Sequence, residues 1–194
     1  MAKMTGYQYF AQMMKGYGIT HSFFVPTILM EAMAEMDELG IQKILTHGEK
    51  AAAYMADGYA RASGRPGLCL AQQIGASNLA AGLRDGYMAG SPMVAITGGP
   101  SVASRYKHAY QEVEDFSQFD SVSKLSLQAD DVSRLPDLLR QLFRAVTTGA
   151  PRPVHLRLQG SHGQGLAGMI DAPLIIEEQY RQVPAHRPEP EEWD

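Results

Sequence analysis

The stretch HGEKAAAYMADGYAR, which begins at His47, contains a carboxylate at a position where it could do chemistry. Glu49 follows the apolar run 41–45 and opens a segment of small residues at helical spacing. Taken alone, Glu49 reads as a helix-end charge, which the helix dipole favours by about 0.3–1 kcal/mol. The alanines behind it, however, predict a helix packed on most sides. A carboxylate at the buried end of such a helix is costly unless a group donates to it, so a working acid is the second interpretation.

A second candidate is the turn QQIGASN at 72–78, which leads from an apolar run into a helix rich in alanine and glycine. Glycine lets a ligand approach the backbone closely, although Gly75 could equally just end a strand. Neither G-x-G-x-x-G nor GK[ST] occurs, so no dinucleotide or phosphate loop is predicted. The glycine-rich stretch GSHGQG at 160–165 reads as a flexible loop.

The remaining reactive residue types give weaker signals. Gln111 and Glu112 lie in the irregular stretch 101–121, which is either a surface loop or, because it is long, a functional one. The six histidines form no H-x-x-x-H pair, so no metal site is expected. His155 alternates with apolar neighbours and is expected to face the sheet surface. Cys69, the single cysteine, is expected to be a small buried hydrophobe.

The elements that position these residues alternate between strand and helix. Thr5 is the expected N-cap of the first helix. The expected strands are too apolar to face water, so both faces of their sheet should be covered. They predict an α/β three-layer sandwich, in which helices cover both faces of a mostly parallel sheet of about six strands. Expected strands span 21–25, 41–45, 67–71, 92–97, 122–127 and 153–158, and expected helices span 5–17, 28–39, 49–62, 77–89 and 131–148.

Three turns follow strands of this sheet: Pro26 with Thr27, the segment 47–49, and the segment 72–78. Ligands of parallel sheets bind beyond the carboxyl ends of the strands. We therefore expect these turns to converge on one edge of the sheet.

Composition limits the classes of protein. The chain has 194 residues, a formal net charge of −4 and no long basic run, which argues against nucleic acid as the main partner. No apolar stretch approaches the ~20 residues needed to span a bilayer, and the N-terminus lacks a signal-peptide pattern, so a cytoplasmic setting is expected. Residues 1–170 are predicted to form one domain, and 171–194, with several prolines and acids, an extended linker or tail.

Four stretches together resemble a known family: HGEKAAAYMADGYARASGRPGLCL, GASNLAAGLRDGYMAGSPMVAITG, AYQEVEDF and GAPRPVHLRL. Their order and spacing are similar to those of the pyrimidine-binding N-terminal domain of thiamine-diphosphate enzymes, in the acetolactate synthase, pyruvate oxidase and benzoylformate decarboxylase group. The resemblance covers about residues 3–160 and is most specific from Glu49 through MADGYAR. The tail resembles the linker that leads to the middle domain of those enzymes.

The resemblance implies roles for the candidate residues. Glu49 matches the glutamate that hydrogen-bonds N1′ of the cofactor's aminopyrimidine, which favours the imino tautomer and lets the exocyclic N4′ take the proton from C2. Pro26, Thr27, Gly75 and Asn78 would line the cofactor cleft, and Gln111 would lie on the substrate side. The implied reaction is decarboxylation or carboligation of a 2-oxo acid or related carbonyl substrate.

The chain also departs from the family pattern. Thr27 stands where the family often has a glycine, Gly48 where it often has a histidine, and Gln73 with Ile74 where it often has the first two residues of G-P-G. The family holds the diphosphate and Mg²⁺ through a separate domain with a G-D-G motif and a downstream asparagine, which are not found here. Some relatives carry FAD in a middle domain, and these residues do not decide for or against it.

Three hypotheses follow. The first is that the chain is the pyrimidine-binding domain or subunit of a thiamine-diphosphate enzyme. It would work in a homo- or hetero-oligomer, in which a separate diphosphate-binding domain or subunit binds Mg²⁺. The second is a non-catalytic scaffold or regulatory domain that retains the fold. The third, an unrelated nucleotide-binding domain, is disfavoured because the phosphate-binding loops are missing.

Overall fold

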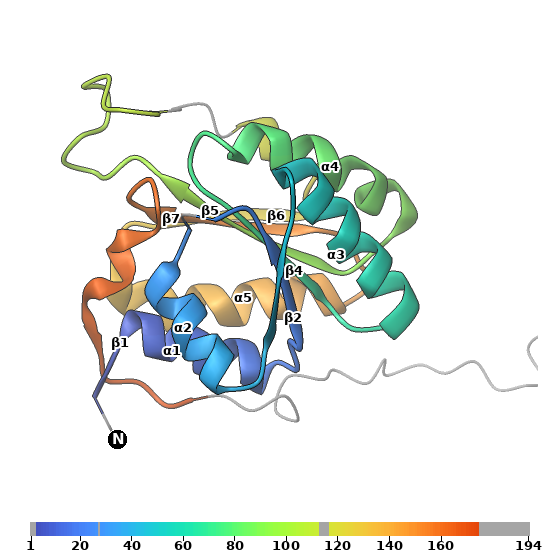
Figure 1. Ribbon diagram of the computed structural model, residues 1–194, viewed down its shortest axis with the longest axis horizontal. Helices are drawn as coiled ribbons and strands as arrows, with labels where there is room; N and C mark the ends of the chain where they lie inside the picture. The colour runs from blue at the N-terminus through green and yellow to red at the C-terminus, as the bar shows by residue number, and fades with distance from the viewer. Residues whose placement is uncertain (1–2, 27, 113–116, 175–194) are drawn as a thin grey trace, which may run out of the picture.

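A computed structural model describes residues 3–26, 28–112 and 117–174. Its centre is a six-stranded sheet of order β3-β2-β4-β5-β7-β6, in which all pairings are parallel (Figure 1). The strands are β2 (His21–Phe24), β3 (Gln42–Leu45), β4 (Gly67–Ala71), β5 (Met93–Gly99), β6 (Leu125–Ala129) and β7 (Val154–Gln159). A separate antiparallel pair joins β1 (Met4–Thr5) to β8 (Met169–Ile170).

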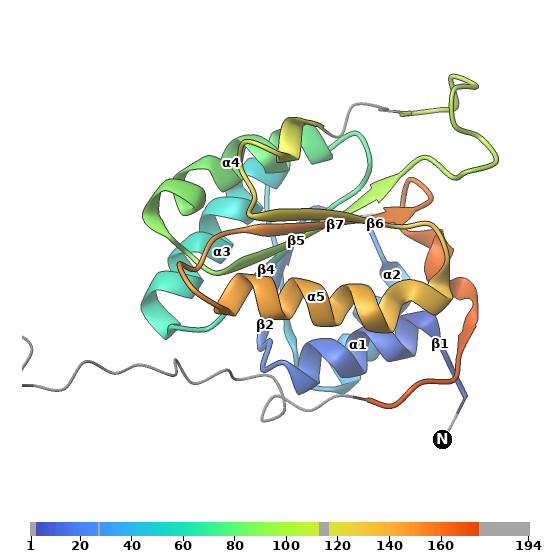
Figure 2. The same cartoon turned by 180° about the vertical axis from the view of Figure 1, so that it is seen from behind.

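Helices cover both faces of the sheet, which confirms the three-layer α/β sandwich (Figures 1 and 2). Helices α3 and α4 lie on one face, and α1, α2 and α5 lie on the other. Their bounds are α1 (Gly6–Gly16), α2 (Met30–Glu38), α3 (Glu49–Ser63), α4 (Ala76–Ala89) and α5 (Leu135–Thr147), with short 3₁₀ helices η1 (Ser117–Phe119), η2 (Val132–Arg134) and η3 (Gln164–Ala167).

The strand order creates a switch point at the centre of the sheet. From β2 the chain passes through α2 outward to β3, and it then returns through α3 to β4 on the other side of β2. From β4 it passes through α4 in the opposite direction to β5. Loops after β2 and β4 therefore diverge, and the carboxyl ends of these two strands flank the crevice where such folds bind ligands.

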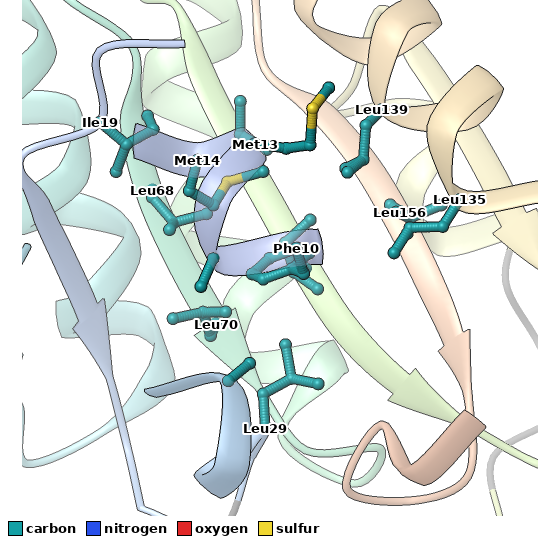
Figure 3. Packing of buried hydrophobic residues seen from close by; sticks show 14 of the residues in the cluster. Phe10, Met13, Met14, Ile19, Leu29, Leu68, Leu70, Leu135, Leu139 and Leu156 are labelled. Carbon is teal, nitrogen blue, oxygen red and sulfur yellow. The ribbon is translucent and has the colours of Figure 1, made fainter. Parts of the chain in front are cut away.

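The two faces of the sheet bury different side chains. Large residues such as Phe10, Met13 and Leu139 fill the layer between the sheet and α1, α2 and α5 (Figure 3). The layer under α3 and α4 is built mostly of small residues, including Ala52, Ala53 and several other alanines. Small side chains let α3 and α4 pack closely on each other and on the sheet, which brings their N-termini near one another.

Several expectations about single residues are settled by the structure. Thr5 caps α1 in a capping box with Gln8, as expected. Cys69 is fully buried, also as expected, and burial raises the pKa of its thiol. The predicted helix start at residue 28 is wrong, because Leu29 adopts a left-handed conformation (φ 49°) and its backbone N donates to the carbonyl of His162.

The strand expected at 122–127 is β6, which begins only at Leu125. Val122 and Ser123 instead close the turn after η1, because the backbone N of Val122 and the hydroxyl of Ser123 both donate to the carbonyl of Phe119. Phe119 is fully buried in the layer under α3 and α4. The start of this segment therefore packs as a turn, and the strand begins after it.

The expectation that His155 faces the surface is wrong. Its side chain is fully buried, stacked on Phe119 with ring centroids 3.5 Å apart. Its Nε2 shares a hydrogen bond with Thr97 Oγ1 (2.8 Å) and its Nδ1 shares one with Ser126 Oγ (2.9 Å). Burial, helped by the charge of Arg157, lowers the pKa of His155 to about 3. His155 is thus a neutral core residue that links β5, β6 and β7.

Among the residues that the structure describes, no helix is both long enough and apolar enough to cross a membrane. The predicted tail lies outside the described residues from 175 onward, so the domain boundary at 170 stays a prediction. The chain remains attached to the domain as far as Pro173, whose carbonyl accepts a hydrogen bond from the Tyr9 hydroxyl (3.0 Å).

Candidate functional site

Glu49 is the first residue of α3, and Gly48 before it has the extended backbone of an N-cap (φ −176°, ψ 158°). The expectation that α3 is packed on most sides is wrong: Tyr54 and Met55 are 44% and 46% exposed. Glu49 itself is half-buried. Its carboxylate therefore lies at the positive end of a helix but remains within reach of a ligand.

The turn before α4 packs directly against this carboxylate. Asn78 Nδ2 donates to Glu49 Oε2 over 3.3 Å. A Cβ added at Gly75 would collide with the carboxylate, lying 2.7 Å from Glu49 Cδ. Glycine leaves room for the carboxylate in this position without a shift of the side chain. The structure brings together three of the predicted site residues, Glu49 from α3, Gly75 from the turn before α4 and Asn78 from α4.

Close packing of α3 on α4 maintains this contact. At Gly82, about two turns beyond Gly75, an added Cβ would lie 2.6 Å from the Cβ of Ala53 and 2.7 Å from the carbonyl oxygen of Lys50. The backbones of the two helices therefore approach each other as closely as they can. This spacing fixes the start of α4, and with it Asn78, relative to Glu49.

Pro26 is exposed just beyond the end of β2, and Thr27 lies outside the described residues. A backbone link ties this strand end to the turn that carries Glu49. Thr46 donates to the carbonyl of Phe24 through its backbone N (2.9 Å) and through Oγ1 (3.1 Å). The ends of β2 and β3 are thus held in register beside the switch point.

Gln111 lies on the segment that follows β5, which extends beyond the carboxyl edge of the sheet (Figure 1). Its backbone is left-handed (φ 61°), and its buried Oε1 has no hydrogen-bond partner among the described residues. Its neighbour Glu112 holds the segment together, because the carboxylate accepts from the backbone N of Tyr106 (3.0 Å) and of Ala109 (2.9 Å). Gln111 is therefore set on a different loop from the Glu49 cluster.

A cavity of about 480 Å³ lies beyond the ends of β4, β5 and β7. Its wall includes Gln73 from the turn after β4, Ser101 and Glu112 from the segment after β5, and Ser161 from the loop after β7. Sequence reasoning did not predict this cavity. The available signal was the concentration of glycine at the ends of two strands, at Gly98, Gly99 and Gly160.

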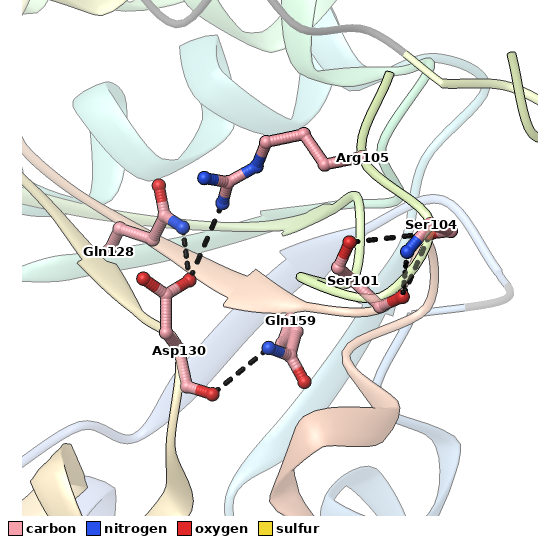
Figure 4. Close-up of polar contacts among 6 residues, drawn as sticks. All are labelled: Ser101, Ser104, Arg105, Gln128, Asp130 and Gln159. Atoms are coloured by element: carbon pink, nitrogen blue, oxygen red, sulfur yellow. Dashed lines mark hydrogen bonds and ion pairs between the residues drawn. The ribbon is translucent and has the colours of Figure 1, made fainter. Parts of the chain in front are cut away.

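Polar contacts fix one wall of this cavity (Figure 4). Ser101 Oγ and Ser104 Oγ lie 2.8 Å apart, and Gln159 Nε2 donates to the carbonyl of Asp130 over 3.0 Å. The carboxylate of Asp130 lies 3.6 Å from Arg105 Nη2. These bonds hold the segment after β5 against the ends of β6 and β7.

The stretch at 160–165, expected to be a flexible loop, connects three turns of the site. The backbone N of Gly99 donates to the carbonyl of Gly160 (3.1 Å) and that of Gln73 donates to the carbonyl of Ser161 (3.0 Å). The carbonyl of His162 accepts from Leu29, after β2 (2.9 Å). Glycine-rich composition here reflects close backbone approach between the strand ends.

The donor set limits which groups this site could hold. Within the described ranges, no group of three or more histidine, cysteine, aspartate or glutamate side chains could hold a metal ion. The half-buried carboxylate of Glu49, oriented by one amide and packed against a glycine, suits a neutral ring nitrogen that shares a proton with it. These residues therefore fit the pyrimidine half of thiamine diphosphate.

Comparisons with known proteins agree with this geometry. Residues 4–119 match the family described as "Thiamine pyrophosphate enzyme, N-terminal TPP binding domain". A probable acetolactate synthase large subunit of Methanocaldococcus jannaschii is 39% identical over 59% of this chain and 20% of its own length. The acetolactate synthase of Bacillus subtilis is 33% identical over 68% of this chain and 24% of its own.

Among solved structures, the fold is similar to that of a thiamine diphosphate-dependent 4-hydroxybenzoylformate decarboxylase of Rhodococcus jostii RHA1. The TM-score is 0.78 at 19% identity, over 87% of this chain and 32% of that one. The chain thus spans between a fifth and a quarter of the length of the acetolactate synthases above. Because the family match covers more than half of the chain, the chain belongs to the thiamine pyrophosphate enzyme family and contains its N-terminal TPP-binding domain.

Proposed function

We propose that this chain is the pyrimidine-binding part of a thiamine diphosphate-dependent decarboxylase or carboligase that acts on a 2-oxo acid or a related carbonyl substrate. The observation that carries the proposal is the cluster of Glu49, Gly75 and Asn78 at the N-termini of α3 and α4. Thiamine diphosphate, when bound, supplies electron-sink chemistry at its thiazolium ring. The chain contributes proton control and orientation.

In this proposal Glu49 holds a proton against the pyrimidine N1′. Asn78 donates to Oε2 of the carboxylate, and this bond sets its orientation. Gly75 leaves the space beside it that the carboxylate occupies. Pro26 and Thr27, after β2, would form the opposite side of the cofactor cleft, at the switch point of the sheet.

We assign the binding of the diphosphate and Mg²⁺ to a partner domain or subunit. This chain would form an oligomer with that partner. Exposed apolar side chains on α3 and α4 and in the turn between β4 and α4 support such a partner. They are Tyr54, Met55, Ile74 and Met88, between 44% and 71% exposed. Docking on this face would cover apolar surface and close the site around Glu49. The proposal includes a cytoplasmic setting.

The test uses the assembly of this chain with the diphosphate-binding domain that completes it. Titration calorimetry with thiamine diphosphate and Mg²⁺ is followed by turnover assays with pyruvate, 2-oxobutanoate, 3-hydroxypyruvate and benzoylformate. We expect cofactor binding only when both parts are present, and turnover of at least one 2-oxo acid. The scaffold hypothesis predicts the opposite, with no cofactor binding under any combination of chain, domain and metal.

A further inference from the structure

Gln73 joins the two halves of the candidate site. It lies in the turn between β4 and α4, close in sequence to Gly75, and it also lines the cavity of about 480 Å³. Its backbone is held on both sides, since its N donates to the carbonyl of Ser161 (3.0 Å) and its carbonyl accepts from the N of Ala76 (3.2 Å). These bonds fix the backbone from which the side chain extends.

The side-chain amide of Gln73 has an unused donor. The residue is only 2% exposed, and its buried Nε2 has no hydrogen-bond partner in the described part of the chain. Leaving a buried amide donor without a partner costs about 1–3 kcal/mol. An oxygen atom of a ligand in the cavity would recover that free energy.

Several other polar groups on the cavity wall already have hydrogen-bond partners. The carboxylate of Glu112 accepts two backbone N–H groups, Ser101 pairs with Ser104, and Ser161 Oγ lies 3.2 Å from His162 Nδ1. These bonds shape the wall and use the polar groups that take part in them. The amide of Gln73 is thus a buried donor on this wall that has no hydrogen-bond partner among the described residues.

Resting on the proposed function, we propose that Gln73 determines substrate specificity: Nε2 donates a hydrogen bond to an oxygen atom of a small polar substrate in the cavity. The oxygen belongs to a carboxylate or a hydroxyl group. A site built to bond a polar group rejects analogues that lack it, because its own buried donor is then left unpaired. The cavity therefore selects carbonyl substrates that carry this carboxylate or hydroxyl oxygen over analogues of similar size that lack it.

Two variants of the complete assembly test this role. Gln73→Leu keeps approximate size and removes the donor, and Gln73→Glu keeps the shape but replaces the donor by a negative acceptor. Gln141→Leu, on the exposed side of α5, is the matched control. Values of kcat and KM are measured with pyruvate, with 3-hydroxypyruvate, which adds a hydroxyl, and with acetaldehyde, which lacks the carboxylate and whose turnover is followed by the ligation of two molecules to acetoin. The Tm of each variant reports whether the turn still folds.

For Gln73→Leu we expect kcat/KM to fall about 10- to 100-fold, mainly through KM, for substrates that carry the bonded oxygen, and to change little for the analogue without it. If the oxygen is a carboxylate, pyruvate is affected and acetaldehyde is not, and Gln73→Glu is worse than Gln73→Leu. If it is a hydroxyl, 3-hydroxypyruvate is affected more than pyruvate, and Gln73→Glu restores part of the loss because a hydroxyl can also donate. Gln141→Leu should match the wild type.

An equal loss for all three substrates, or no loss, would overturn the inference about Gln73. Glu49→Gln separates this failure from failure of the proposed function. If Glu49→Gln abolishes turnover while both Gln73 variants behave as wild type, only the Gln73 role is wrong. If the wild type turns over no 2-oxo acid, or Glu49→Gln has no effect, the proposed function fails and the Gln73 role fails with it.

Discussion

Glu49 and Gly75 come from different turns, and the carboxylate of Glu49 occupies the space that a Cβ at position 75 would take. The contact was predictable in part. Parallel topology brings successive strand ends to one edge, and a glycine turn facing a lone carboxylate at that edge is a recognisable pattern. The resemblance supplied the chemistry. The hydrogen bond from Asn78 and the missing Cβ at Gly75 depend on the distance between α3 and α4, which no local pattern encodes.

Gly75→Ala tests this contact directly. The added Cβ overlaps the carboxylate of Glu49 and must displace it. We expect turnover of the assembly to fall at least about tenfold, since a misplaced catalytic group costs up to 10²-fold, while the free energy of unfolding changes little because the flexible side chain of Glu49 can move aside. Steady-state kinetics and urea unfolding measure the two effects.

Gly58→Ala in α3 is the matched control, because a Cβ there meets no atom within 4 Å. It should leave turnover unchanged and stabilise the helix by up to about 1 kcal/mol. Wild-type turnover in Gly75→Ala would show that the position of Glu49 is not set by this contact.

At the scale of elements, the alternation of strands and helices was predictable because each buried strand is a short apolar run and each helix shows its own period. The predicted bounds of elements were wrong where tertiary contacts override the local sequence pattern. Leu29 is forced out of α2 by its bond to the loop after β7, and Val122 is drawn into the turn that buries Phe119. His155 was misplaced because alternation marks a half-exposed strand, whereas both faces of β7 are covered.

Burial of His155 makes stability depend on pH. Its pKa is lowered from the ordinary 6.5 to about 3. Between these pH values His155 is therefore protonated in the unfolded chain and neutral in the folded chain. Stability from this group is complete above about pH 6.5 and is lost as pH falls toward 3, by about 1.4 kcal/mol per pH unit. Urea unfolding followed by circular dichroism between pH 7 and pH 4.5 should show this slope.

His155→Gln removes the titrating ring and should flatten the slope, although it lowers stability at pH 7 through lost packing on Phe119. Equal slopes in the two proteins over this range would contradict a neutral, buried His155. The comparison isolates this residue because the other histidines are common to both chains.

At the scale of the whole molecule, the fold presents a crevice and an apolar helix face. The crevice follows from the strand order, and the sequence predicted the architecture through the order of its elements, whereas the exposed apolar side chains on α3 and α4 were not predicted. The cavity beside Gln73 was not predictable, because its wall combines three segments that are far apart in the chain: the turn after β4, the segment after β5 and the loop after β7.

A charged substitution on the apolar face tests the docking surface. In Met55→Glu with Met88→Glu, both exposed positions gain a charge that must be desolvated on docking. We expect affinity for the diphosphate-binding domain to fall at least about tenfold, while the Tm of this chain changes little because surface changes are usually within about 0.5 kcal/mol. Met169→Glu, on β8, is the control, and unchanged affinity in the double variant would place the partner elsewhere.

The central claim is that Glu49 controls proton transfer in the bound cofactor, and the rate of C2 proton exchange in thiamine diphosphate tests it most directly. In the complete assembly, Glu49→Gln keeps the shape of the side chain and removes the acid, and Glu38→Gln, exposed at the end of α2, is the control. Quenched-flow NMR should find exchange slowed about 10²-fold or more in Glu49→Gln and unchanged in Glu38→Gln. Exchange at the wild-type rate in Glu49→Gln, with the cofactor still bound, would contradict the account.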